Sequence, residues 1–313
     1  MVREGCERKG GASSAASGHE SVSAAVGVLH EPPRRRGGNR RLALAGIVVA
    51  VALLAAVALA GHALAGVATA TDFSAKNLMP TLGGAGAAAH PFGTDWMGRD
   101  MLARTLAGLS TSVFVGLLAA VCSSVIALAL AAVAALGGRA ADAAVSWLID
   151  LVMGLPHIVL LILVSYALGR GFWGVTIAVA VTHWPSLARV LRAEILQVRE
   201  RPFMQLARSL GVSRARLATT HLLPHVLPQL LVGLVLMFPH AILHEAAITF
   251  LGFGLSPDEP AIGVILSEAM QYLSAGYWWL AAFPGLALLV VVLAFDRLGS
   301  LVRRLVDART IQE

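Results

Sequence analysis

The sequence has little charge, few aromatic residues, only two lysines and only two cysteines. Charged residues make up 13% of the 313 positions, hydrophobic residues make up 57%, and the mean hydropathy is +0.76. Soluble domains carry about 25% charged residues, so this composition excludes an ordinary soluble protein and indicates an integral membrane protein. The cysteines, Cys6 and Cys122, lie far apart in different surroundings, which excludes a disulfide framework and a CxxC metal site. Neither Lys9 nor Lys76 belongs to a phosphate-binding glycine loop, so this chain is not expected to hydrolyse ATP.

Six apolar blocks are each long enough to cross a bilayer as a helix. The first covers residues 42–61 and is expected to be an uncleaved signal anchor. The other five cover approximately residues 112–136, 143–168, 172–191, 226–251 and 278–301. The sequence therefore predicts an all-α integral membrane protein with six transmembrane helices.

The basic residues predict how these helices are oriented. If the N-terminus is inside, twenty of the 24 Lys and Arg residues fall in internal segments, mainly in the N-terminal tail and in the loop at residues 189–216. The four on the outside are Lys76, Arg99, Arg104 and Arg170. This bias follows the positive-inside rule and predicts that both termini are cytoplasmic. Topology and contacts with lipid headgroups or a partner then explain the net charge of +6, and no nucleic-acid partner is expected.

The long internal loop contains a predicted helix-turn-helix at residues 203–228. A short helix is expected at residues 204–210, followed by Gly211 as a left-handed cap. A second helix is expected at residues 213–221, and Pro224 is expected to end it because proline cannot continue a helix.

This loop resembles the EAA loop of the membrane subunits of binding-protein-dependent ABC importers. In that family the loop is the cytoplasmic element that docks into a groove on the ATPase subunit and transmits its closure. Gln205 stands where the family has Glu, which keeps the shape and loses one charge, and Leu206 stands where the family has Ala. The positions that carry the resemblance are Gln205, Leu206, Ala207, Gly211, Leu223 and Pro224.

A second stretch, residues 90–100, resembles the HPxGTDxxGRD signature of the C-type permease of peptide and nickel ABC importers. Its chemistry predicts a tight turn with two glycines. Asp95 and Asp100 are expected to cap the following helix, and Arg99 is available to pair with them. The signature positions are Gly93, Thr94, Asp95, Gly98, Arg99 and Asp100.

Further similarity extends the resemblance over about residues 88–309. Residues 245–254, EAAITFLGFG, are similar to the family's EASLSFLGLG, and residues 295–299 stand where the family has Phe-Asn-Leu-Leu-Gly. Within this region Asp150 is expected to face protein or water, because an unpaired charge in a membrane is costly. Pro156 is expected to kink the third span.

Four histidines lie in the apolar blocks. His240 and His244 are four residues apart and share one helix face, so they form half of a common type of metal site. The alternative is that the histidines form hydrogen bonds between helices. We expect the translocation path to involve some of these residues: His157, His183, His240, His244 and Glu245. His183-Trp184 also resembles a sequence of nickel-type permeases in the family.

Two other protein classes fit less well. An intramembrane zinc protease requires HExxH, but Ile248 occupies the position of the second histidine and His240 lies on the other side of the pair. A secondary transporter working alone is expected to contain inverted repeats or more helices, and no repeat is visible.

The resemblance implies a permease subunit of an ABC importer in a bacterial or archaeal cytoplasmic membrane. Such a subunit is not an enzyme and binds no cofactor itself; ATP is used by partner subunits. The implied partners are a homologous B-type permease, two ATPase subunits and an external substrate-binding protein. The histidines favour nickel or a metal chelate as substrate, with short peptides as the alternative.

The predicted organisation follows from these observations. Residues 1–41 form a disordered basic cytoplasmic tail, and residues 42–87 form the first transmembrane helix with an outer linker. Residues 88–309 form the permease domain with a coupling loop at residues 199–228, and residues 310–313 form a short tail.

Overall fold

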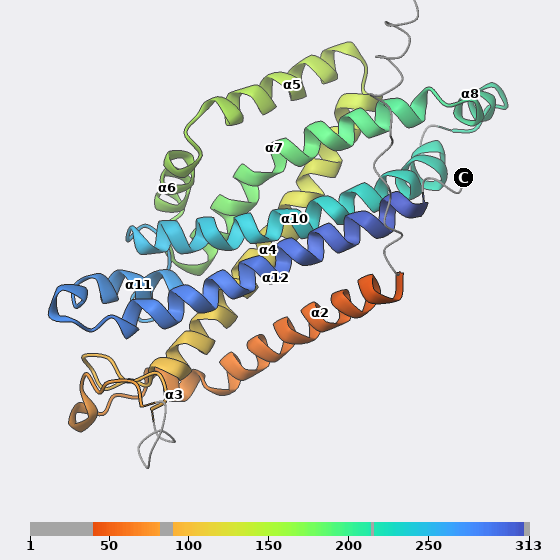
Figure 1. Cartoon of the computed structure of the whole chain (residues 1–313). Helices are drawn as coiled ribbons and strands as arrows, with labels where there is room; N and C mark the ends of the chain where they lie inside the picture. Colours follow the sequence, from red (N-terminus) through yellow and green to blue (C-terminus); the bar gives the residue numbers. More distant parts are fainter. Residues whose placement is uncertain (1–39, 82–89, 214–215, 310–313) are drawn as a thin grey trace, which may run out of the picture. The chain divides into compact units, whose positions relative to one another are not determined.

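The computed structural model describes residues 40–81, 90–213 and 216–309, and the regular structure in these ranges is helical, without a β-strand (Figure 1). Its elements are α2 (Arg40–Ala63), α3 (Ala65–Thr69), η2 (Phe73–Ala75), α4 (Met101–Leu136), α5 (Arg139–Gly154), α6 (His157–Ala167), α7 (Gly171–Arg199), α8 (Pro202–Ser209), η3 (Leu217–Leu222), α10 (Leu223–Phe250), α11 (Ile262–Met270), η4 (Leu273–Ala275) and α12 (Trp279–Arg309). Most of the predicted tail at residues 1–41, part of the predicted outer linker and residues 310–313 lie outside the described ranges.

Four of the described helical segments are long and apolar enough to cross a membrane: Leu44–Ala63, Met101–Leu136, Leu217–Phe250 and Trp279–Leu305. Helices α5 and α6 would together make a fifth span. The predicted block at residues 172–191 lies within α7, which does not meet the same criterion, since polar residues around His183 and charged residues from Arg189 onward lower its hydropathy. The structure therefore confirms an all-helical membrane protein with four or five candidate spans.

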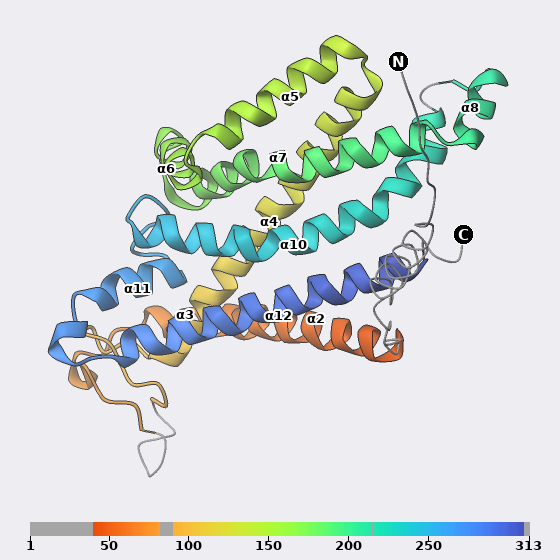
Figure 2. The same ribbon diagram turned by 45° about the horizontal axis from the view of Figure 1, so that its top comes forward.

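Helix α4 packs against α2, α7 and α10 (Figures 1 and 2). Its buried surface is rich in small residues such as Ala119 and Ala120. A Cβ added to Gly61 of α2 would lie 2.3 Å from the Leu106 carbonyl oxygen and 2.5 Å from Ser110 Cβ, both in α4. Small residues let neighbouring backbones approach closely, which is how helices pack where lipid removes the hydrophobic driving force.

The loop that contains α8 and the turn at residues 90–100 lie at opposite ends of these helices. The beginning of α2, the end of α12 and the whole of α8 lie at one end in both views, whereas α3 and α11 lie at the other (Figures 1 and 2). The loop that contains α8 is therefore separated by the length of the helices from the turn that precedes α4.

The third predicted span is broken rather than kinked. Helix α5 ends at Gly154, α6 begins at His157, and the two axes differ by 97°. The break follows from Pro156, because proline disfavours helical backbone at the residue before it; Leu155 is accordingly extended, with ψ of 142°. The bend predicted at Pro156 is therefore present, but as a complete break between two helices instead of a kink within one.

The predicted end of the second helix in the loop was wrong. A π-helical turn, η3, leads directly into α10, and Pro224 lies in the first turn of α10 instead of ending a helix. Proline is tolerated there because the first N–H groups of a helix have no partner within it. The loop therefore consists of α8, a turn and a π-helical segment continuous with α10.

The close approach of α2 and α4 generates a prediction about stability. We expect Gly61→Ala to lower the unfolding midpoint of the detergent-purified protein, since overpacking costs about 1–3 kcal/mol and exceeds the gain of roughly 1 kcal/mol in helix propensity. Gly66→Ala in α3 is the matched control, because no neighbouring atom lies within 4 Å of the added Cβ. Equal midpoints for the two variants would contradict the packing described here.

Candidate functional site

The loop that contains α8 presents an apolar surface. Leu206 of α8 is 61% exposed and Leu210, which follows α8, is 74% exposed. Gln205 is also exposed, and its side-chain Nε2 donates to the backbone oxygen of Glu200 at 3.1 Å. Leu223 and Pro224, at the start of α10, are exposed as well. The loop thus offers apolar side chains and backbone to a partner.

Gly211 turns the chain after α8. Its φ is +76°, in the left-handed region that favours glycine. The N–H of Val212 donates to the Ala207 oxygen at 3.2 Å, which is the pattern that closes a helix with a left-handed residue. This part of the predicted loop has the conformation that its sequence predicts.

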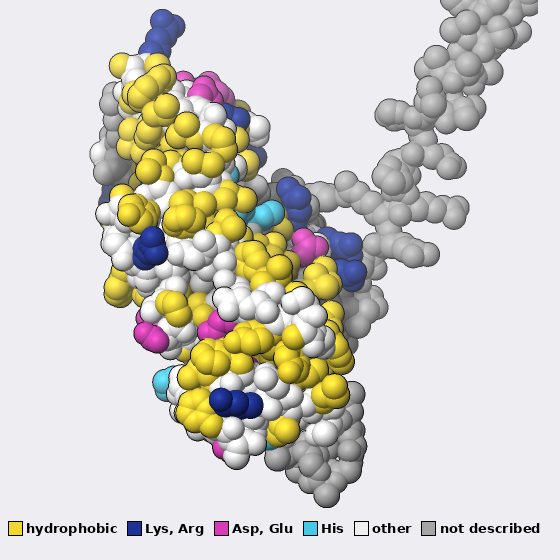
Figure 3. Space-filling view, turned by 90° about the vertical axis from the view of Figure 1, so that its left-hand side faces the viewer, with side chains coloured by type: hydrophobic (Ala, Val, Ile, Leu, Met, Phe, Trp, Pro, Cys, Tyr) yellow, Lys and Arg dark blue, Asp and Glu magenta, His cyan; other side chains and the backbone are white. Residues whose placement is uncertain are grey.

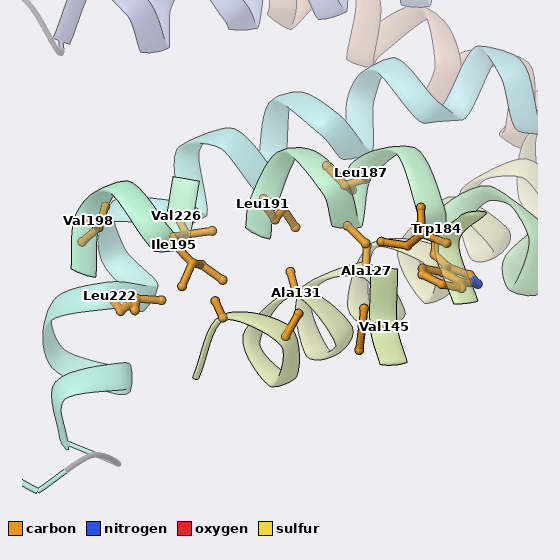
Figure 4. Packing of buried hydrophobic residues seen from close by; sticks show 14 of the residues in the cluster. Ala127, Ala131, Val145, Trp184, Leu187, Leu191, Ile195, Val198, Leu222 and Val226 are labelled. Atoms are coloured by element: carbon orange, nitrogen blue, oxygen red, sulfur yellow. The ribbon is translucent and has the colours of Figure 1, made fainter. Parts of the chain in front are cut away.

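A buried apolar cluster attaches this loop to the long helices. Met204 of α8 is 1% exposed and belongs to the same cluster as Val198, Ile195 and Leu222. Figure 4 shows side chains of α7 facing Ala127 and Ala131 of α4, Val145 of α5, Leu222 of η3 and Val226 of α10. Because close-packed interiors transmit strain, a displacement of α8 is expected to displace the side chains of α7 and α10 that pack against it.

The sequence analysis missed an aromatic contact inside the loop. The ring of Phe203, in α8, stacks on the ring of His225 in α10 with centroids 5.4 Å apart, and it lies 6.2 Å from the ring of His221 in η3. His225 Nδ1 also lies 2.6 Å from the His221 oxygen. The spacing of four residues between His221 and His225 indicates that they share one helix face. The sequence analysis did not use this signal because it ended the helix at Pro224, between the two histidines.

At the opposite end, a network of buried charges joins the turn at residues 90–100 to α4 and α11. Asp95 Oδ2 lies 2.6 Å from both Arg99 Nε and Arg104 Nη1. Glu268 Oε2 of α11 accepts from Arg99 Nη2 at 2.8 Å and from Arg104 Nη2 at 3.0 Å. Asp95 and Arg104 are only 2% and 4% exposed, so each charge depends on its partners for compensation.

Hydrogen bonds from backbone N–H groups to side chains of the signature turn further fix its conformation. Asp100 caps α4 as predicted, accepting from the Ala103 N–H at 2.7 Å, and α4 therefore begins at Met101, ahead of the apolar block at residues 112–136. Asp95 does not cap α4 as predicted; it pairs with arginines. Thr94 accepts from Leu78 N at 2.9 Å through its hydroxyl.

The glycines of this turn are required by their surroundings. Gly93 and Gly98 have φ of +75° and +77°. A Cβ on Gly98 would lie 1.7 Å from the Asp72 oxygen, and one on Gly93 would lie 2.5 Å from the Leu78 oxygen. Both residues let the turn lie directly against the segment before it. Sequence reasoning found this turn but missed Glu268 and the pairing of Arg104.

Three of the four histidines of the apolar blocks come together. His157 begins α6, His183 lies in α7 and His244 lies in α10, and one ring nitrogen from each lies within 4.8 Å of the others. His183 Nε2 lies 3.2 Å from His244 Nδ1, and the His157 ring centroid is 4.6 Å from each of the other two.

The remaining residues of this predicted site lie apart from that group. His240 is exposed, and its backbone oxygen accepts from His244 Nδ1 at 2.8 Å. Glu245 is fully buried, and its Oε1 accepts from the Thr249 hydroxyl at 3.0 Å. Asp150, which was not part of this predicted site and was expected to face protein or water, is exposed and pairs with Arg189 at 2.8 Å.

The buried charge network generates a second prediction about stability. Arg104→Met should lower the free energy of unfolding by about 3 kcal/mol, because removal of one partner leaves a buried charge poorly compensated and only Arg99 remains to pair with both carboxylates. Arg189→Met breaks a pair whose members are 54% and 71% exposed and should cost about 0–1 kcal/mol. Thermal unfolding of the purified variants measures both effects; an Arg104 variant no less stable than the Arg189 variant would refute the network's structural role.

The helical fold and the candidate membrane spans define a multi-pass membrane protein. Residues 123–311 match the family model described as "Binding-protein-dependent transport system inner membrane component". The chain belongs to this family and is a permease component of the peptide/nickel class of ABC importers.

Individual relatives are consistent with this assignment. The chain is 35% identical over 295 residues to a protein of Brucella suis biovar 1 whose name is that of a peptide permease, covering 93% of this chain and 94% of that protein. It is 29% identical to the dipeptide transport system permease protein DppC of Bacillus subtilis, over 85% of this chain and 81% of DppC. A crystal structure of an amino acid ABC transporter with histidines shares the fold, with a TM-score of 0.51 and 22% identity over 64% of this chain and 93% of the other.

Proposed function

We propose that this chain is the C-type permease of an ATP-driven importer of short peptides. The observation that carries this proposal is the 35% identity over 93% of the chain to a relative named a peptide permease. A second relative, named for dipeptide transport, points the same way. These relatives favour short peptides, the alternative of the sequence analysis, over nickel or a metal chelate.

In the proposed topology the chain crosses the membrane six times, with both termini in the cytoplasm. The six spans are α2, α4, the broken pair α5 and α6, α7, α10 and α12. This arrangement places α8 inside and the turn at residues 90–100 outside, in keeping with their positions at opposite ends of the helices (Figure 2). The membrane is the cytoplasmic membrane of a bacterium or archaeon.

The proposed partners are a homologous B-type permease, two ATPase subunits and an external substrate-binding protein. The chain binds no cofactor, and the ATPase subunits hydrolyse ATP. Exposed Leu206 and Leu210 dock into the ATPase, with Gln205 beside them. The two permeases together enclose the translocation path, and this chain contributes half of its wall.

Transport then follows from the packing of α8. The loaded binding protein docks on the outside, and ATP binding closes the ATPase pair. That closure displaces α8, and the apolar cluster around Met204 carries the displacement to α7 and α10. Packed helices switch between discrete arrangements instead of deforming continuously, so the path opens alternately to the two sides.

The coupling role of the loop can be tested at Gly211. Gly211→Val forces a β-branched residue into a left-handed conformation, at a cost of about 1–2 kcal/mol, and should reduce ATP-driven uptake by roughly tenfold. Gly211→Asn is the matched control and should retain most uptake, because asparagine tolerates this conformation. Co-purification with the ATPase measures assembly in parallel. Unchanged uptake by the valine variant, at matched membrane abundance, would show that this turn does not couple transport to ATP.

The substrate class can be tested by uptake in cells that carry the complete transporter. A labelled dipeptide should accumulate, and an unlabelled dipeptide in excess should compete with it. Radioactive nickel supplied as the free ion should not accumulate above cells without the transporter. Nickel uptake without dipeptide uptake would overturn the peptide proposal and would support nickel as the substrate, as the histidines in the sequence suggested.

A further inference from the structure

The three clustered histidines are poorly explained as a hydrogen-bonded packing contact. Within the described part of the chain, only one hydrogen bond joins two of the rings, between His244 Nδ1 and His183 Nε2 at 3.2 Å. Neither ring nitrogen of His157 bonds to another described residue, although its ring lies edge-on to both neighbours. Three imidazoles that meet to satisfy one another would be expected to share more bonds than this.

Two of the three rings also donate to a backbone oxygen, as metal-binding histidines commonly do. His183 Nδ1 lies 2.9 Å from the Val179 oxygen, and His244 Nδ1 lies 2.8 Å from the His240 oxygen. A carbonyl oxygen only accepts, so in each case Nδ1 donates its hydrogen and the neutral ring keeps a lone pair on Nε2. Metal-binding histidines characteristically donate their other N–H to a backbone carbonyl or carboxylate, which fixes tautomer and ring orientation.

The composition and spacing of the group also suit a metal ion. Among the described residues the cluster contains three imidazoles and no carboxylate. Imidazole ligands select zinc, copper or nickel over magnesium or calcium. Metal–nitrogen bonds of about 2.0–2.1 Å place tetrahedral ligands roughly 3.4 Å apart. Nitrogens that lie within 4.8 Å of one another therefore need to approach by at most about 1.4 Å.

We propose that His157, His183 and His244 form a binding site for one late transition-metal ion, with zinc as the reference ion. The three ligands come from α6, α7 and α10, so the bound ion ties these helices together. His240 is not a ligand: its side chain is exposed, and its part in the site is the backbone oxygen that orients His244. The site differs from the His240 and His244 pair predicted from the sequence, and it does not depend on the peptide proposal.

The three ligands lie on helices of different length, so a bound ion would join a short helix to two long ones. His157 stands directly after the break at Leu155 and Pro156, whereas His183 and His244 lie within long helices that continue to the α8 end of the unit. A bound ion therefore holds the short helix α6 against α7 and α10. Metal binding should stabilise the arrangement in which these three helices meet.

The test uses the complete purified transporter, carrying an affinity tag without histidine, and Co²⁺ as the spectroscopic probe with Zn²⁺ as competitor. Wild type should give the intense visible absorption of tetrahedral Co²⁺, saturating at one ion per copy of this chain and abolished by Zn²⁺. His183→Gln and His244→Gln should each weaken binding by at least about 10-fold. His157→Gln should do the same.

His240→Gln is the matched control, because it lies on α10 one turn from His244 and keeps the backbone oxygen that His244 uses. This variant should bind Co²⁺ as wild type does. Zn²⁺ should also raise the unfolding midpoint of wild type and of the His240 variant, but not that of the His183 variant. Absence of the tetrahedral signal in wild type would overturn the proposal without reference to any variant, and so would equal binding by wild type and His183→Gln.

Discussion

The structure depends on the close packing of small residues along α4. In a membrane, apolar surface gains nothing by leaving lipid for another helix, so association relies on contact between backbones and small side chains. Gly61 and the alanines of α4 allow that contact, and Gly116 does the same against Ile242 of α10. Figure 3 views the molecule from the end that carries α3 and α11, where hydrophobic side chains lie among other atoms and a few charged side chains.

This packing connects the two ends of the protein. Helix α4 carries Arg104 and begins directly after the turn that holds Asp95. Its later residues join the apolar cluster that also contains Met204 of α8. Helices α7 and α10 have one end in that cluster and carry His183 and His244 further along. In the proposed mechanism a movement of α8 therefore reaches the histidines through two continuous helices instead of through a chain of loops.

Much of the fold could be predicted from the sequence because its signals are local. Apolar length predicts long helices, Asp100 predicts a helix start, and Gly211 predicts a left-handed turn; each of these depends on neighbouring residues alone. The effects of proline were less predictable. The bend expected at Pro156 is a complete break between α5 and α6, and Pro224, expected to end a helix, lies in the first turn of α10 after a π-helical turn.

The candidate sites were less predictable because their partners are distant in sequence. The spacing of His240 and His244 indicates one helix face, but only the packing of three helices brings His157 and His183 to His244 and leaves His240 aside. Glu268 lies 164 residues from Arg104, and no local pattern connects them. The proposed substrate class rests on relatives named for peptides, whereas the histidines in the sequence had favoured nickel or a metal chelate.

The most direct measurement is photo-crosslinking from two positions in the assembled transporter. A photoreactive residue at Leu206, in α8, should crosslink to the ATPase subunit, and the same residue at Trp96, in the turn at the opposite end, should not. This result would establish both the docking surface and the orientation of the helices. Crosslinking of the ATPase from Trp96, or its absence from Leu206 in a complex that transports, would contradict the account.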